Sequence, residues 1–90
     1  MLELGSSQDL QLFHNGTNSH INSKTGELDI RSDDFHLRNQ ANNENMIVAT
    51  ANGAVELYHN NSRKIFTTST GAQISCGPDG DGLKLEGTTN

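Results

Sequence analysis

Val55-Glu56-Leu57-Tyr58-His59-Asn60-Asn61-Ser62 is the stretch that decides the fold, because Leu10-Gln11-Leu12-Phe13-His14-Asn15-Gly16-Thr17 repeats its pattern. Each stretch reads aliphatic, polar, Leu, aromatic, His, Asn, turn residue, hydroxyl, at an offset of 45 residues, and Thr25-Gly26 stands opposite Thr70-Gly71 at the same offset. Alternating apolar and polar residues predict a β-strand, and the residues after it predict a turn. One strand and its turn are therefore expected twice, which favours a fibrous or stacked architecture over a compact enzyme.

Short alternating runs separated by Gly and Asn turns continue along the chain. We expect strands at 10–13, 17–21, 28–31, 35–38, 46–51, 54–58, 64–67, 72–76 and 83–85. Asn15-Gly16 favours a type I′ turn with positive φ at both residues. A helix over 40–51 is the alternative to the strand at 46–51, but asparagine and β-branched residues disfavour it.

The composition gives a single chain little to bury. Only 31% of the 90 residues are hydrophobic, which is low for a globular protein. The backbone loses roughly 1–2 kcal/mol of entropy per ordered residue. A chain rich in Asn, Ser, Thr and Gly must either stay unfolded or complete its core and its strand edges with other copies of itself. Self-association is therefore expected.

Charge and targeting signals exclude several partners. The net charge is −5 with only six Lys and Arg, so no basic stripe is available for nucleic acid. No apolar run approaches the ~18 residues of a membrane helix, and no signal peptide pattern is present, so neither membrane insertion nor an export signal is expected. Cys76 is the single cysteine and cannot form an intrachain disulfide.

The histidines do not form a local metal motif. No His-x-His or His-x₃-His spacing occurs, and Cys76 has no histidine close by in the sequence. A metal could bind only on a three-fold axis to which each chain contributes one imidazole, from His14 or His59. The simpler interpretation is that these residues, with His20 and His36, are exposed at strand ends and turns. No metal or cofactor is predicted.

Acidic and glycine-rich stretches likewise predict no catalytic residue. Asp79-Gly80-Asp81-Gly82 resembles half of a calcium loop but lacks the distal glutamate, so a plain turn is expected. Asp33 and Asp34 are adjacent, and neighbouring strand residues point to opposite faces, so they cannot easily act as an acid–base pair. No serine lies in a Gly-x-Ser-x-Gly motif. We expect that the chain is not an enzyme.

The repeats resemble those of phage tail-fibre shaft proteins, especially of marine and cyanobacterial phages. The matching residues are Asp9 to Ile21, Gly26 to Asp33, and Met46 to Tyr58 continued to Ile74, about three-quarters of the chain. The resemblance implies a structural role in the virion, extracellular when acting, and a parallel homotrimer. The expected fold is all-β, with short strands in an intertwined homotrimeric β-helix or β-prism fibre. Other tail-fibre or baseplate proteins are the implied partners.

The predicted organisation has three parts. Residues 1–8 are expected to be a leader or junction, 9–75 the repeat-containing β fibre segment, and 76–90 a Gly-rich C-terminal segment with a short strand. The alternating apolar residues should form the trimer core: Leu10, Leu12, Leu28, Ile30, Leu37, Ile47, Val55, Leu57, Ile65 and Ile74. The chain would then be a rigid shaft that positions a receptor-binding tip. The alternative is a carbohydrate-binding module or adhesin that contacts a host surface glycan through its four aromatic residues and its asparagines.

Overall fold

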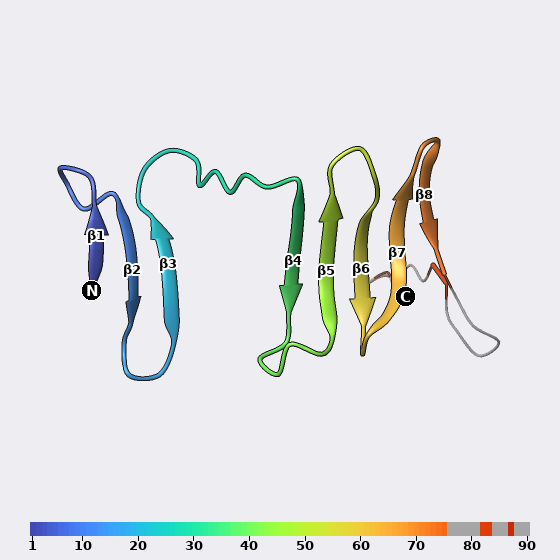
Figure 1. The fold of residues 1–90 in the computed structure, drawn as a ribbon, viewed down its shortest axis with the longest axis horizontal. Helices are drawn as coiled ribbons and strands as arrows, with labels where there is room; N and C mark the ends of the chain where they lie inside the picture. Colours follow the sequence, from blue (N-terminus) through green and yellow to red (C-terminus); the bar gives the residue numbers. More distant parts are fainter. Residues whose placement is uncertain (76–81, 84–86, 88–90) are drawn as a thin grey trace. The chain divides into compact units, whose positions relative to one another are not determined.

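The computed structural model describes residues 1–75, 82, 83 and 87, and its regular elements in this part of the chain are all β-strands. The chain divides into two compact units, residues 1–31 and residues from 32 onward, and each contains one antiparallel sheet (Figure 1). The prediction of an all-β fold is confirmed. The sheets are open in the described chain.

The first sheet has three strands in chain order: β1 (Leu2–Leu4), β2 (Leu10–His14) and β3 (Ser19–Ser23). Leu12 at the centre of β2 lies opposite Leu2 on one side and Ile21 on the other. β1 lies within residues 1–8, for which only a leader or junction was expected.

The second sheet is a five-stranded meander, again in chain order. Its strands are β4 (Asp34–Arg38), β5 (Asn45–Thr50), β6 (Val55–His59), β7 (Ser62–Thr68) and β8 (Gly71–Ile74). Register shifts occur between Leu37 and Arg38 and between Leu57 and Tyr58, so one strand of each pair carries an extra residue there. The 46–51 region is strand β5, and the helical alternative was wrong.

The two hairpins of the repeat close differently. Asn60 and Asn61 both have positive φ, 50° and 65°, so the two-residue type I′ turn lies there. In the first hairpin a four-residue loop, 15–18, connects the paired residues His14 and Ser19, and only Gly16 has positive φ, at 97°. The predicted type I′ turn at Asn15-Gly16 was wrong, because the Asn15 side chain accepts hydrogen bonds from the Thr17 and Asn18 amides and stabilises a longer loop.

The repeat extends beyond the stretch that revealed it. The pair Leu2 and Leu12 in the first sheet corresponds to Ile47 and Leu57 in the second, 45 residues later, and the pair Leu4 and Leu10 corresponds to Ala49 and Val55. The three-stranded arrangement β1-β2-β3 therefore recurs as β5-β6-β7. The pairing of β1 with β2 matches that of β5 with β6, whereas β6 and β7 differ from β2 and β3 by a bulge and a shorter turn.

One predicted strand is missing and another cannot be assessed. Residues 28–31 form no strand. The prediction failed because alternation identifies side chains that share a face, whereas a strand also needs a hydrogen-bonded partner, and this segment has none among the residues that the structure describes. The predicted strand at 83–85 and the end of the one at 72–76, at Cys76, fall on residues outside the described part of the chain.

Candidate self-association surfaces

One face of the second sheet is apolar across all five strands. Residues that pair across an antiparallel sheet point to the same face, and the pairing places Leu57 between Ile47 and Ile65. A second row runs beside the first, in which Ala49 connects Phe35 with Val55. Thr67 is the member of the second row on β7, opposite Ala72. The apolar residues of the two rows form the second-sheet apolar face: Phe35, Leu37, Ile47, Ala49, Val55, Leu57, Ile65, Ala72 and Ile74.

No other part of the described unit covers this face. Its six largest exposed side chains, Phe35, Leu37, Val55, Leu57, Ile65 and Ile74, retain between 38% and 44% of their accessible surface. The row positions carry no charged residue. A contiguous exposed apolar surface of this kind marks a site of interaction with another molecule.

The first sheet has a smaller apolar face of the same design. Leu2, Leu4, Leu10, Leu12 and Ile21 line a shallow apolar hollow on one side of its three strands. Leu12 and Ile21 are 48% and 63% exposed. We call this set the first-sheet apolar face. Both repeats thus present an apolar face with no cover in their own unit.

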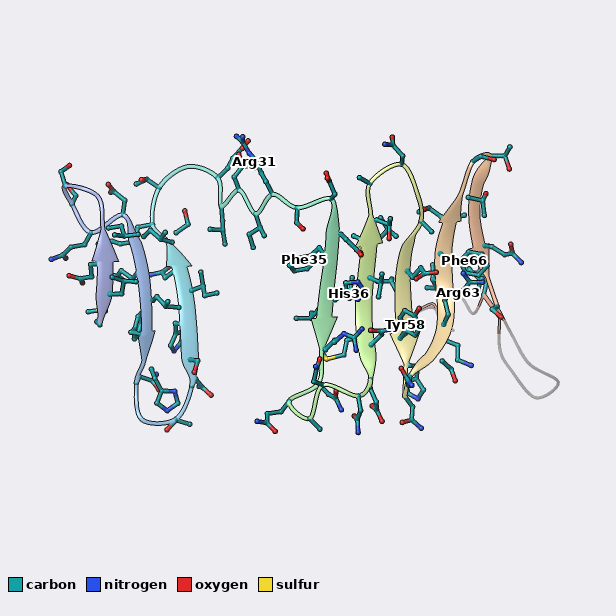
Figure 2. All side chains as sticks on the ribbon, in the orientation of Figure 1. Arg31, Phe35, His36, Tyr58, Arg63 and Phe66 are labelled. Atoms are coloured by element: carbon teal, nitrogen blue, oxygen red, sulfur yellow. The ribbon has the colours of Figure 1, made fainter. Side chains whose placement is uncertain are left out.

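The opposite face of the second sheet is covered by its own polar side chains. Both oxygens of the Glu56 carboxylate are engaged: the Tyr58 hydroxyl donates to Oε1 at 3.1 Å and the Arg63 guanidinium donates to Oε2 at 2.9 Å. The guanidinium also lies 3.6 Å from the centre of the Phe66 ring. Figure 2 labels both residues, which belong to β7. Val48 lies in the row between His36 and Glu56 and is only 7% exposed, the one buried side chain in the described chain.

Two pKa shifts show how this polar layer is held. The hydrogen bonds from Arg63 and Tyr58 lower the pKa of the Glu56 carboxyl group. Desolvation, followed by the hydrogen bond to Glu56, raises the pKa of the Tyr58 hydroxyl. Both shifts favour an ionised carboxylate beside a protonated phenol, which is the combination that the hydrogen bond requires. Glu56, Tyr58 and Arg63 therefore satisfy one another within the chain.

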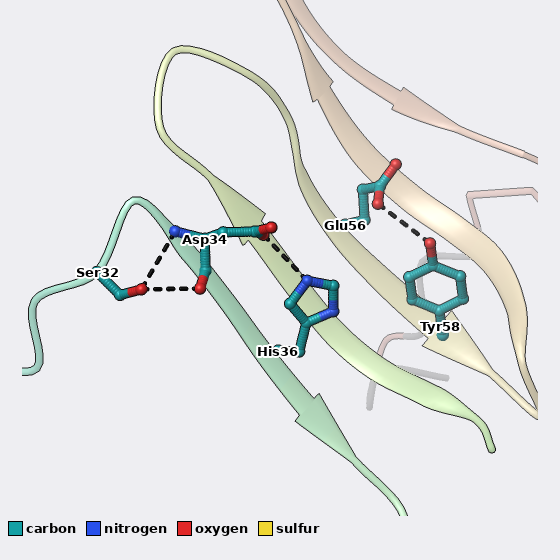
Figure 3. A network of polar contacts seen from close by, with 5 residues as sticks. All are labelled: Ser32, Asp34, His36, Glu56 and Tyr58. Atoms are coloured by element: carbon teal, nitrogen blue, oxygen red, sulfur yellow. Dashed lines mark hydrogen bonds and ion pairs between the residues drawn. The ribbon is translucent and has the colours of Figure 1, made fainter. Parts of the chain in front are cut away.

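On the same face, Asp34 contacts the His36 ring at 3.0 Å, and Ser32 Oγ accepts a hydrogen bond from the Asp34 amide (Figure 3). Asp34 is thus paired with a histidine and not with Asp33. The two carboxylates do not form an acid–base pair.

The opposite face of the first sheet is also polar. The Asn22 amide donates to Gln11 at 3.2 Å and the Gln11 amide donates to Glu3 at 3.3 Å, which forms a ladder across all three strands. Beside it the rings of Phe13 and His20 stack with centroids 4.7 Å apart. Each sheet therefore has two different faces. On one face polar side chains bond to one another, and the other face is apolar and exposed.

Most predicted core residues fall on the two apolar faces. Leu10 and Leu12 lie on the first, and Leu37, Ile47, Val55, Leu57, Ile65 and Ile74 lie on the second. Leu28 and Ile30 lie outside any strand and are 47% and 62% exposed. The predicted set omitted Leu2, Leu4, Ile21, Phe35, Ala49 and Ala72. The repeat offset could have identified Leu2 and Leu4, which correspond to Ile47 and Ala49.

The structure forms no metal cluster from the residues it describes: no three His, Cys, Asp or Glu side chains come together there. His14 and Ser19 Oγ are 3.0 Å apart across the first hairpin, and His59 lies at the end of β6. Asp79, Asp81 and Cys76 lie outside the described part of the chain. That part also contains no helix long and apolar enough to cross a membrane.

Comparison of the chain with protein-family models, with curated proteins and with solved structures found no match.

Proposed function

We propose that the chain is a non-enzymatic structural segment of a phage tail fibre, a homotrimeric shaft that holds a receptor-binding tip away from the virion. The observation that carries the proposal is the pair of apolar faces, one in each repeat, that nothing in the described chain covers. Three chains whose apolar faces meet on a common axis would bury them and leave the polar faces in water. The assignment to a phage is supported by the resemblance of the repeat sequences to those of phage tail-fibre shaft proteins.

Stiffness is the mechanical output of such a segment. Each additional repeat would lengthen the rod by the same elements, which are short strands, their turns and one apolar face. The trimeric β-helix or β-prism belongs to this proposal, as do the location in the virion and the contacts with other tail-fibre or baseplate proteins.

A glycan-binding module has less support, because the aromatic side chains on the polar faces already have partners. Phe13 stacks on His20, and Arg63 covers Phe66. The Tyr58 hydroxyl donates to Glu56. A sugar ring would have to displace these contacts before it could stack.

Immunogold electron microscopy tests the assignment. Antibodies raised against this chain should label fibre shafts, between the baseplate and the tip, on virions whose proteins include the chain. Antibodies against the capsid serve as the control for access. Label confined to the fibre tip, or its absence from virions that contain the chain, would contradict a shaft.

A further inference from the structure

Among the residues that the structure describes, strand β3 has a hydrogen-bonding partner on one side only. It pairs with β2 and forms an edge of the first sheet. Its counterpart in the second sheet, β7, pairs with β6 on one side and with β8 on the other. The repeat is therefore incomplete in the first sheet by one strand, the counterpart of β8.

The pairing scheme identifies the missing residues. Leu12 lies opposite Ile21 where Leu57 lies opposite Ile65, so Ile21 corresponds to Ile65 at an offset of 44 residues on this side of the hairpin. Ile65 pairs with Ile74 in β8. With the same offset of 44 residues, the counterpart of Ile74 in the first repeat is Ile30. Asp29 and Leu28 then correspond to Gln73 and Ala72. The missing strand is 27–30, within the segment whose alternation predicted a strand.

One contact within the segment is compatible with an extended strand. The Arg31 guanidinium donates to the Asp29 carboxylate at 3.3 Å, a contact between residues two apart, as on one face of an extended chain. Leu28 and Ile30 alternate with this pair. Gly26 has φ of 74°, a conformation that the second central residue of a tight turn can use.

Two features explain why the strand is not formed in the single chain. In the β7–β8 turn the Thr68 hydroxyl accepts from the Thr70 amide and donates to the Gly71 carbonyl oxygen. Lys24 corresponds to Thr68 and has no hydroxyl to make these bonds. Pairing would also add Leu28 and Ile30 to an apolar face that is exposed to water, so it gains little burial until that face is covered.

We propose that 27–30 becomes the fourth strand of the first sheet, in register Ile21–Ile30, when a second copy of this chain covers the first-sheet apolar face. A second copy is the partner because the first-sheet apolar face contains no charged side chain, so the same face of another copy is complementary to it. Leu28 and Ile30 then join Leu12 and Ile21 in the interface. The inference rests on the self-association proposed above, but not on the phage assignment.

An engineered disulfide tests the register. In a Cys76→Ser background, Asn22→Cys with Asp29→Cys places two cysteines at positions that would pair at about 4.5–5.5 Å between Cα atoms. The control, Asn22→Cys with Arg31→Cys, uses the same face two residues out of register, about 7–8 Å apart. We expect the first pair to oxidise at least tenfold faster, as an intrachain product on a non-reducing denaturing gel, and the mass of the native particle is measured on the same samples.

Equal oxidation of the two pairs would overturn the strand. A product linked between chains would overturn its assignment to the chain's own segment. Fast intrachain oxidation in a particle with the mass of one chain would support the strand and overturn the second copy as its cover. The failure of the fourth strand and the failure of self-association are thus distinguished.

Discussion

Replacement of Leu57 by Asn is expected to dissociate the assembled protein into single chains. Leu57 lies at the centre of the second-sheet apolar face and is 40% exposed in the chain alone. Full burial of a leucine stabilises by about 1.5–3 kcal/mol, so covering the exposed 40% of Leu57 contributes roughly 1 kcal/mol per chain, and a trimer loses this contribution three times. An amide buried without a partner costs roughly 1–3 kcal/mol more per chain.

The matched control is Phe66→Asn. Phe66 lies opposite Glu56 and contacts Arg63, on the polar face of the same sheet. Sedimentation velocity at equal chain concentration should show one chain per particle for Leu57→Asn and an unchanged particle for Phe66→Asn. If the Leu57→Asn variant sediments as the parent does, the second-sheet apolar face is not the interface.

Val48→Ala and Val55→Ala are expected to destabilise the protein about equally. The two substitutions remove the same two methyl groups, at a cost of about 2 kcal/mol when the site is covered. Val48 is 7% exposed and covered within the chain, whereas Val55 is 44% exposed and would be covered only by another copy.

Urea unfolding at one fixed chain concentration measures the difference, because the stability of an oligomer depends on concentration. A loss of about 2 kcal/mol at both positions supports a covered Val55. A loss at Val48 with less than about half as much at Val55 is what a bare sheet would give, and it would contradict assembly through this face.

The sequence predicted which side chains share a face of a sheet better than it predicted which strands pair with one another. Alternation placed Val55, Leu57 and Ile65 together because side-chain direction in a strand is set locally, by a period of two. Pairing is not local. Residues 28–31 have the same alternation, but they have no partner strand among the described residues, and the register of β7 and β8 is the basis for the pairing proposed above.

The turn types and strand β1 are the other features that the sequence did not predict. Asn15-Gly16 is the stronger type I′ signal of the two repeats, yet the Asn15 side chain selects a longer loop and the type I′ turn forms at Asn60-Asn61. Leu2 and Leu4 are too few to read as a strand by themselves. The stretch at 55–62 therefore predicted the repeat, while the extent of each sheet came from the cross-strand hydrogen bonds.

Sedimentation equilibrium of the full chain measures the central claim most directly. If the chain is a homotrimer, we expect a single species with the mass of three 9.7 kDa chains, and that mass should persist on dilution through the micromolar range. A folded, monodisperse species of one chain over the same range would contradict it, because both apolar faces would then remain exposed to water or be covered within a single chain.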